Sequence, residues 1–123
     1  MKSVCLSSSL RFKEIVRDTL QCFESLGIEA LFPNLDSGLK KEELDLDAMR
    51  KLCQDHFKAI DAADGLYVIN PGGYIGTLVT VEIGYASGRR KPVYYSEPAG
   101  TLDLDALADG IIPLDRIEVF LSL

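Results

Sequence analysis

The stretch that decides the fold is DGLYVINPGGYIGTLVTVEIGYASGRRKPVYY, residues 64–95. Residues 65–69 form an apolar run without the alternation of polar and apolar side chains that a half-exposed strand shows. Such a run is typical of a strand buried on both faces, in a parallel sheet covered by helices. A loop at 70–77, a helix at 77–88 and a strand at 92–96 follow. This order predicts two parallel strands joined by a right-handed helical crossover.

Strands and helices alternate in the same way along the rest of the chain. Residues 34–46 are polar, and we expect an exposed loop with one helical turn there. The alternation predicts one α/β domain over residues 1–123, a doubly wound, Rossmann-like parallel sheet of about five strands with helices on both faces. The remaining predicted elements are strands at 3–7, 28–32 and 111–112, and helices at 10–26, 47–63 and 103–109. For the tail at 114–122 we favour a last helical turn, with a strand as the alternative.

The composition excludes some classes of partner. The 123 residues hold 13 Lys and Arg against 19 Asp and Glu, a net charge of −6, whereas binding a nucleic-acid polymer needs a basic surface. No window approaches the ~18 consecutive apolar residues of a membrane-spanning helix. With 47% apolar and 26% charged residues, the chain has the composition of an ordinary globular protein. We therefore expect a cytoplasmic protein that binds neither a nucleic-acid polymer nor a membrane.

Cysteine usage and short motifs predict a protein without a metal or a cofactor. The three cysteines, Cys5, Cys22 and Cys53, are widely spaced, form no CxxC pair and accompany a single histidine. A disulfide framework and a structural zinc site are both disfavoured by this pattern. Each cysteine lies within an apolar segment and is expected to be a small core residue. The sequences GxGxxG and GxxxxGKS/T are absent, which disfavours a nicotinamide enzyme and an NTPase.

The loops after the first, third and fourth predicted strands are candidates for a ligand site, and the first and third hold the features that favour one. In doubly wound sheets, ligands bind beyond the carboxyl ends of the strands, where the strand order reverses. Ser7, Ser8 and Ser9 follow the first strand and open a helix, and the loop at 70–77 opens another. Helix N-termini present free N–H groups, and three glycines within residues 72–76 allow close approach of the backbone. We expect a polar or anionic ligand here; a plain Pro-Gly-Gly turn is the alternative.

Glu82 is the one charged residue in the predicted helix at 77–88. Its neighbours in the helix are almost wholly apolar, and an unpaired buried charge costs several kcal/mol. The side chain should therefore point into a polar cleft or pair with a cation. The alternatives are an exposed glutamate that the apolar stripe flanks, or a partner for Arg89 or Arg90.

Three other titratable residues have plainer interpretations. His56 falls on the apolar stripe of the predicted helix at 47–63, where a packing role is favoured over that of a general base. Asp61 and Asp64 precede the third strand, at the amino end of the sheet and away from the expected cleft. We expect both to serve as helix-end and turn residues.

Three segments of the stretch 64–95 form a pattern: the strand and loop at 64–77, Glu82-Ile-Gly-Tyr-Ala, and Arg90-Lys-Pro-Val-Tyr. The pattern resembles the nucleoside 2-deoxyribosyltransferase-like proteins, which have a strand, a glycine-containing loop, a helix with Glu-x-Gly-x-Ala and then Gly-Lys-Pro-Val. The similarity follows most of the chain in order, and its specific part is 64–95. It looks closest to bacterial members with a Gly-Tyr-Ile-Gly loop.

This resemblance implies cleavage or transfer of an N-glycosidic bond, on a nucleoside or a nucleoside 5′-monophosphate. By the resemblance, Glu82 is the nucleophile that attacks the anomeric carbon and forms a glycosyl-enzyme intermediate, with net retention. A second base as acceptor makes a transferase, and water makes a hydrolase. By the same resemblance, Ser7 and Ser8 are expected to contact a sugar hydroxyl or a 5′-phosphate. The further substrate-binding residues that the resemblance implies are Asn70, Gly72, Gly73, Tyr74, Gly76 and Thr77.

The chain departs from the family pattern at the end of the third predicted strand. The family has Asp residues there and just before Gly-Thr, whereas this chain has Asn70 and Tyr74-Ile75. An amide forms hydrogen bonds but does not deliver a proton near neutral pH. A second enzyme interpretation is a nucleoside-monophosphate phosphoribohydrolase of the lysine-decarboxylase-like family, whose Thr-to-Glu spacing is shorter than that from Thr77 to Glu82.

A non-catalytic nucleotide-binding or interaction module on the same fold is the alternative to both enzymes. An enzyme should present Glu82 to the glycine loop with open volume beyond it. A module should hold Glu82 in an ion pair or fill the pocket with Tyr74.

The predicted helix at 77–88 also bears on assembly. Its apolar side chains extend around much of its circumference, which is a larger surface than one face of a sheet can cover. In a chain of this size the second cover is expected to be another subunit, so the pattern predicts a homodimer or a larger homo-oligomer. The apolar side chains concerned are Leu78, Val79, Val81, Ile83 and Tyr85.

Overall fold

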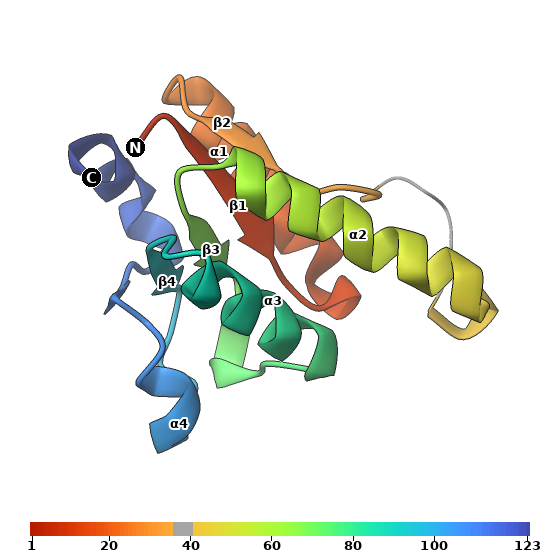
Figure 1. Cartoon of the computed structure of the whole chain (residues 1–123). Coiled ribbons are helices and arrows are strands. Elements are labelled where there is room, and N and C mark those ends of the chain that lie inside the picture. Colours follow the sequence, from red (N-terminus) through yellow and green to blue (C-terminus); the bar gives the residue numbers. More distant parts are fainter. Residues whose placement is uncertain (36–40) are drawn as a thin grey trace.

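The chain folds around a parallel sheet of five strands in the order β2-β1-β3-β4-β5 (Figure 1). Our computed structural model describes residues 1–35 and 41–123, so that part of the expected loop at 34–46 lies outside the described residues. All neighbouring strands pair in parallel, which confirms the fold predicted from the sequence. The strands are β1 (Ser3–Ser7), β2 (Glu29–Leu31), β3 (Leu66–Val68), β4 (Val93–Tyr95) and β5 (Gly110–Ile111).

The strand order reverses between β1 and β3. From β1 the chain moves outward to β2 and then crosses back to β3 on the other side of β1. Ser7, the last residue of β1, lies opposite Val68, the last residue of β3. The N–H of Ile69 then donates to the carbonyl oxygen of Ser7 at 2.9 Å. The carboxyl ends of these two strands therefore form the switch point at which open α/β sheets bind ligands.

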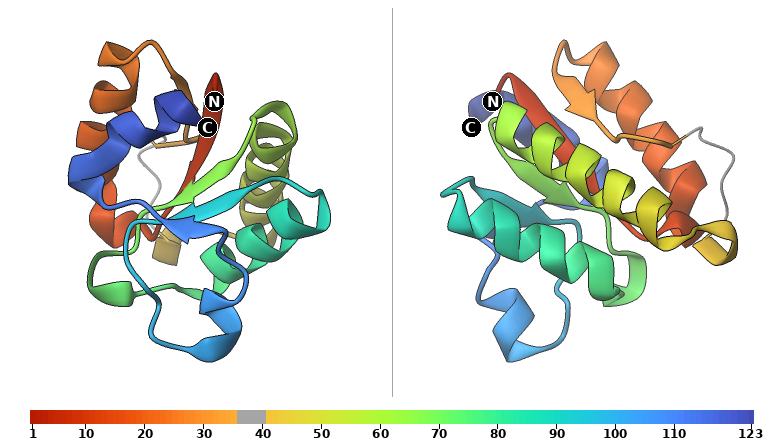
Figure 2. Two further views of the ribbon diagram at one scale, coloured as in Figure 1. Left: turned by 90° about the vertical axis from the view of Figure 1, so that its left-hand side faces the viewer. Right: turned by 45° about the vertical axis from the view of Figure 1, so that its right-hand side comes forward.

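Helices cover both faces of the sheet. The left view of Figure 2 shows the strands between α1 and the C-terminal turns η4 on one side, and α2 and α3 on the other. Side chains alternate accordingly: Leu6 and Tyr67 belong to the core under α1 and η4, whereas Leu66 and Val68 belong to the core under α2 and α3. The helices are α1 (Lys13–Ser25), α2 (Leu46–Ala62), α3 (Thr77–Gly88) and α4 (Leu102–Asp105), with 3-10 turns η1 (Leu10–Phe12), η2 (Lys41–Glu43), η3 (Pro71–Gly73) and η4 (Leu114–Ser122).

The helices begin and end where local chemistry places their boundaries. Gly27 follows α1 with a φ of 75°, a left-handed conformation that glycine adopts without strain. The carboxylate of Asp45 accepts a hydrogen bond from the N–H of Ala48 at 2.7 Å and caps α2. Gly76 precedes α3 and provides no side-chain cap.

Several details differ from the sequence-based expectations. The first turn of the predicted helix 10–26 is the separate 3-10 turn η1, which the Ser9 side chain caps. The predicted helix 103–109 is limited to α4, whereas the predicted helical tail at 114–122 is confirmed and is a 3-10 helix. Cys5 is in the core as expected, but Cys22 is exposed because the buried stripe of α1 runs through Val16, Thr19 and Phe23. Within the described part of the chain, no helix is long and apolar enough to cross a membrane.

Candidate functional site

Buried polar side chains gather at the carboxyl edge of the sheet. Ser7 ends β1, Asn70 follows β3 and Ser96 follows β4, as expected for parallel strands that share one edge. Glu82 from α3 and His56 from α2 join them from the helix layer. All five residues are buried. Hydrogen bonds join Ser7 to Glu82 and Ser96 to Asn70, so the edge is a polar centre whose members are held by one another.

Glu82 lies on the buried stripe of α3, which also includes Val79, Ile83 and Ala86. The carboxyl group is 3% exposed, and its Oε2 accepts a hydrogen bond from the hydroxyl group of Ser7. The alternative of an exposed glutamate is therefore wrong. An ion pair between Glu82 and Arg89 is also excluded. Arg89 pairs instead with Asp61 at 3.3 Å and donates a hydrogen bond to the Tyr85 hydroxyl group.

The surroundings of Glu82 control its charge. Burial raises the pKa of Glu82 to about 7, and the hydrogen bond from Ser7 acts in the opposite direction. Both protonation states are thus accessible near neutral pH, as a tuned catalytic carboxyl group requires. Burial, together with the charge of the nearby Glu82, raises the pKa of the Cys5 thiol to about 12. Cys5 therefore remains a neutral thiol rather than a nucleophile.

His56 is in the core, as its place on the apolar stripe predicts, but it also belongs to the polar centre. The imidazole ring packs edge-on against Phe32 with 5.3 Å between ring centroids. Its Nδ1 is 3.5 Å from Oε1 of Glu82. Burial lowers the pKa of His56, against the raising influence of Asp55 and of the Pro33 carbonyl group. The imidazole is thus predominantly neutral at pH 7.

The side chain of Asn70 joins the ends of β3 and β4. Its Oδ1 accepts hydrogen bonds from the Ser96 hydroxyl at 2.9 Å and from the N–H of Glu97 at 3.1 Å. Its Nδ2 donates to the carbonyl oxygen of Glu97 at 2.8 Å. The Asn70 N–H in turn donates to the Ser96 hydroxyl oxygen. Asn70 is therefore held in place by hydrogen bonds from both ends of its amide group.

The glycine loop owes its conformation to Gly72 and Gly73, whose φ angles are 67° and 83°. A Cβ atom on Gly73 would lie 2.8 Å from the carbonyl oxygen of Pro98, so this position excludes any side chain. The N–H of Gly72 donates to the carboxylate of Glu97 at 3.0 Å. A carboxylate thus already binds a backbone N–H of the loop that was expected to receive a polar or anionic ligand.

The remaining expected site residues lie around this loop. Tyr74 contacts Phe12 edge-on, and the Arg11 guanidinium lies 3.9 Å from the centre of the Tyr74 ring. Ser8 donates a hydrogen bond to the carbonyl oxygen of Ile69 at 2.8 Å and so joins the end of β1 to the end of β3. Gly76 and Thr77 stand at the exposed start of α3. The structure therefore places the expected site residues along one edge of the sheet, with Ser7 and Glu82 in direct contact.

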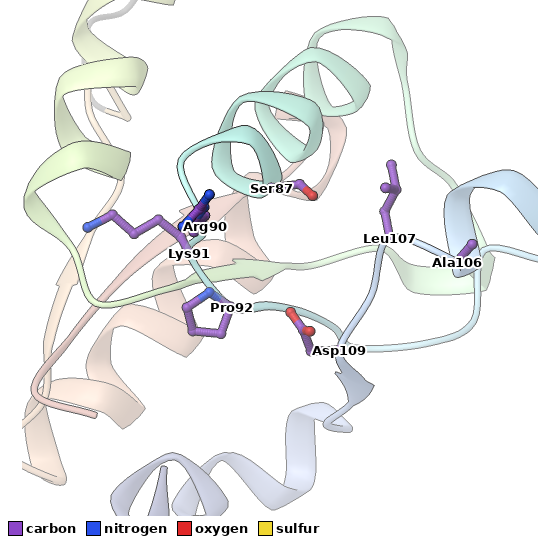
Figure 3. Close-up of a pocket in the computed structure, with 7 residues that line it drawn as sticks. All are labelled: Ser87, Arg90, Lys91, Pro92, Ala106, Leu107 and Asp109. Carbon is purple, nitrogen blue, oxygen red and sulfur yellow. The ribbon is translucent and has the colours of Figure 1, made fainter.

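Asp61 and Asp64 lie at the other edge of the sheet, as expected. The carboxylate of Asp64 accepts hydrogen bonds from the N–H groups of Lys2 and Ser3 at 2.9 and 3.1 Å, at the start of β1. A hollow of about 380 Å³ also lies at that edge, where α3 leads into β4 (Figure 3). Lys91 points out of this hollow and donates to the carbonyl oxygens of Asp61 and Ala63. The hollow contains no member of the polar centre; its lining residues are Ser87, Arg90, Lys91, Pro92, Ala106, Leu107 and Asp109.

Sequence reasoning missed two members of the site, His56 and Glu97. The stripe of α2 predicts that His56 is buried, but the contact with Glu82 depends on how α2 and α3 pack side by side. Glu97 follows directly after the predicted fourth strand, a position that qualifies for the carboxyl edge of the sheet. Its contact with Gly72 depends on the shape of the glycine loop. Across residues 1–35 and 41–123, no group of three or more His, Cys, Asp or Glu side chains is arranged to hold a metal ion.

The chain matches no family model, and no curated protein matches its sequence. Solved structures share its fold. A 2-deoxyribosyltransferase from the psychrotolerant bacterium Bacillus psychrosaccharolyticus is 17% identical, with a TM-score of 0.69 over 94% of this chain and 90% of that chain. BlsM is 17% identical, with a TM-score of 0.63 over 89% of this chain and 79% of its own. A conserved protein from Enterococcus faecalis V583 is 15% identical, with a TM-score of 0.62 over 98% of this chain and 99% of that chain. The chain thus has a nucleoside 2-deoxyribosyltransferase-like fold.

Proposed function

We propose that this protein cleaves or transfers the N-glycosidic bond of a nucleoside or a nucleoside 5′-monophosphate, with Glu82 as the nucleophile. The observation that carries the proposal is the placement of Glu82. Its carboxyl group is buried beside the switch point of the sheet, with one oxygen held by Ser7 and the other facing His56. Similarity of the fold to a 2-deoxyribosyltransferase supports a nucleoside as the class of substrate.

The proposed reaction has two halves. First, a carboxylate oxygen of Glu82 bonds to the anomeric carbon while the carbon–nitrogen bond breaks. The electron pair of that bond leaves with the base, which takes a proton from water. Second, water or another base attacks the anomeric carbon and the electron pair of the ester bond returns to Glu82. The attacking water, or the N–H group of the attacking base, releases its proton to solvent. Two inversions at one carbon give net retention.

A second candidate is a non-catalytic nucleotide-binding module on the same fold. Two observations favour it. Glu82 is 3% exposed, so a sugar reaches it only when the side chains that cover it move. Asn70 stands at the end of β3 and uses both ends of its amide in hydrogen bonds to Ser96 and Glu97. In a module, the polar centre stabilises the sheet edge and the ligand is bound without cleavage.

We also propose that the protein forms a homodimer or a larger homo-oligomer through α3. Val79 and Ile83 are buried against the rest of the chain, but Val81 on the same helix is 47% exposed. A second subunit would remove this apolar side chain from water. Light scattering at micromolar concentration tests the assembly, and Val81→Lys should shift it toward the monomer. A wild-type chain that is monomeric contradicts the proposal.

The experiment that tests the function is incubation with a panel of nucleosides and 5′-monophosphates, with free base followed by chromatography. Intact mass after rapid acid quench should show the added mass of one sugar on the wild type and no adduct on Glu82→Gln. Release of a base by the wild type supports an enzyme. Calorimetric binding of a nucleotide without release of base, at any pH between about 5 and 9, supports the module instead.

A further inference from the structure

One nitrogen of His56 is buried without a hydrogen bond. Nδ1 is the buried side-chain atom, among those of the described residues, that has no hydrogen-bond partner. The histidine is 5% exposed, so water does not compensate for the missing bond. A buried polar atom left in this state destabilises a folded protein by about 1–3 kcal/mol, and it calls for a partner. Oε1 of Glu82 lies 3.5 Å away, just beyond a good hydrogen bond.

The two oxygens of the Glu82 carboxyl group have different neighbours. Oε2 accepts the hydrogen bond from Ser7, whereas Oε1 faces the imidazole. Among the described residues, the other titratable groups that interact electrostatically with this pair are the Cys5 thiol, near Glu82, and the Asp55 carboxylate, next to His56 in the sequence. Cys5 stays protonated near neutral pH because its pKa is raised to about 12. His56 is therefore the group positioned to exchange a proton with Oε1.

Burial affects both members of the pair in the same sense, because it disfavours each charged form. It raises the pKa of Glu82 to about 7 and lowers the pKa of His56 from its ordinary value of 6.5. A protonated carboxyl group and a neutral imidazole are then the stable resting pair. In that pair the carboxyl O–H is a donor and a bare Nδ1 is an acceptor, which are complementary.

We propose that His56 is the positioning residue of Glu82, and that Oε1 and Nδ1 close to hydrogen-bonding distance and share one proton. Phe32 holds the imidazole from the side by its edge-on contact. Ser7 holds the far oxygen, so the carboxyl group is fixed at both ends. The shared proton follows from the geometry of the pair, whereas its catalytic meaning rests on the proposed function.

The proton balance gives His56 its part in the reaction. Transfer of the proton from Oε1 to Nδ1 leaves a carboxylate and an imidazolium, with no net change in charge. The carboxylate then attacks the anomeric carbon as the base departs. When water or an acceptor base later frees Glu82, the imidazolium returns its proton to the carboxylate. The nucleophile is thus ionised for attack and neutral at rest, which limits the cost of an isolated buried charge.

A nuclear magnetic resonance titration tests the shared proton without any activity. His56 is the single histidine of the chain, so every imidazole signal belongs to it. The nitrogen shifts should be followed from about pH 4 to about pH 10 in the wild type and in Glu82→Gln. We expect the wild-type nitrogen shifts to show a second step near the Glu82 pKa of about 7, because loss of the shared proton removes the hydrogen bond to Nδ1, and we expect Glu82→Gln to lack this step. Glu24→Gln, on the exposed face of α1, is the matched control and should leave the titration unchanged. Identical titrations in the wild type and Glu82→Gln would overturn the proposal.

A second variant, His56→Phe, tests the role in catalysis. Phenylalanine keeps an aromatic ring against Phe32 but has no nitrogen to take the proton. We expect kcat to fall at least about tenfold, with the rising limb of the pH profile moved to higher pH and KM little changed. If His56 only packs against Phe32, the rising limb of the pH profile should stay at the same pH in His56→Phe. An unshifted limb would therefore contradict the proposal. If the wild type releases no base from any nucleoside, the proposed function fails, and the titration still decides whether the proton is shared.

Discussion

The hydroxyl group of Ser7 donates a hydrogen bond to Oε2 of Glu82 and joins the end of β1 to α3 across 75 positions of sequence. The hydroxyl group donates, so it favours the ionised carboxylate and lowers the pKa of Glu82, while burial raises it. The value of about 7 is the balance of these two opposed influences. Ser7 therefore keeps a buried carboxyl group within reach of ionisation at neutral pH.

Removal of this hydroxyl group should move the pH dependence of the reaction. In Ser7→Ala the carboxylate loses its donor, so we expect the pKa of Glu82 to rise and the rising limb of the kcat profile to shift to higher pH by roughly one unit. The measurement is the pH–rate profile with the best nucleoside of the panel. Ser25→Ala removes a hydroxyl group from the exposed end of α1 and serves as the control. An unshifted limb in Ser7→Ala shows that the hydrogen bond does not tune Glu82.

Glu82→Gln should separate catalysis from binding. The amide keeps the size of the carboxyl group but does not attack the anomeric carbon, so we expect turnover to fall by at least about a thousandfold. Affinity for the nucleoside should survive, because the nucleophile acts mainly in the transition state. Calorimetric binding and chromatographic release of base measure the two effects. In Glu82→Ala, added azide should restore part of the cleavage. Release of base by Glu82→Gln at the wild-type rate contradicts the nucleophile.

The sequence predicts the sheet because its determinants are local. The apolar run at 65–69 and the alternation of elements are sufficient for parallel pairing, and the reversal of order then places Ser7 and Asn70 at one edge. Glu82 stands out because it is the one charged residue of an almost wholly apolar helix. These features depend on the order of residues along the chain, which can be interpreted without knowledge of the packing.

The contacts of His56 and Glu97 depend on geometry that periodicity does not contain. The 3.5 Å approach of Nδ1 to Glu82 depends on how α2 and α3 pack side by side. The hydrogen bond from Gly72 to Glu97 depends on two consecutive positive φ angles in the loop. Cys22 shows the same limit on a smaller scale, because a shift of one position along a helix moves a side chain by about 100°. Burial stripes are predictable, whereas contacts between side chains of separate elements are not.

The glycine loop should tolerate no side chain at Gly73. Alanine there meets both a φ of 83° and a carbonyl oxygen 2.8 Å from its Cβ atom, so we expect the free energy of unfolding to fall by about 2 kcal/mol or more. The matched control is Gly84→Ala in the interior of α3, where a Cβ atom meets nothing within 4 Å. This control should raise the stability by up to about 1 kcal/mol. Urea unfolding of both variants measures the contrast, and equal stabilities contradict it.

Replacement of Asn70 by aspartate, the residue that the family pattern has at the end of the third strand, should destabilise this protein. In Asn70→Asp a carboxylate oxygen replaces the Nδ2 that donates to the Glu97 carbonyl oxygen at 2.8 Å. Two acceptors would then face one another in a buried site, and we expect a loss of about 3 kcal/mol at pH 7. Asn34→Asp is the exposed control, because Asn34 contacts Asp55 at the surface, and it should cost less than about 1 kcal/mol. A loss in Asn70→Asp no larger than in the control shows that the edge can accept an acid.

The raised pKa of Glu82 should also make the stability of the folded protein depend on pH. The folded pKa of about 7 exceeds the ordinary value of 4.5, so between these values the folded state holds a proton that the unfolded state has released. The contribution of this proton to the stability of the folded protein is therefore complete below about pH 4.5 and is lost as the pH rises through about 7. The shift of about 2.5 pKa units corresponds to a loss on the order of 3 kcal/mol.

Glu82→Gln removes this titration, which makes the difference between the two proteins the quantity to measure. We expect the free energy of unfolding of Glu82→Gln, minus that of the wild type, to be constant below about pH 4.5, to rise between about pH 4.5 and 7, and to level off above. Urea unfolding over this range gives both curves, and their subtraction removes every group that titrates alike in the two proteins. Glu24→Gln, which changes an exposed carboxylate, should give a flat difference. A flat difference for Glu82→Gln as well would show that the folded protein does not raise the pKa of this carboxyl group.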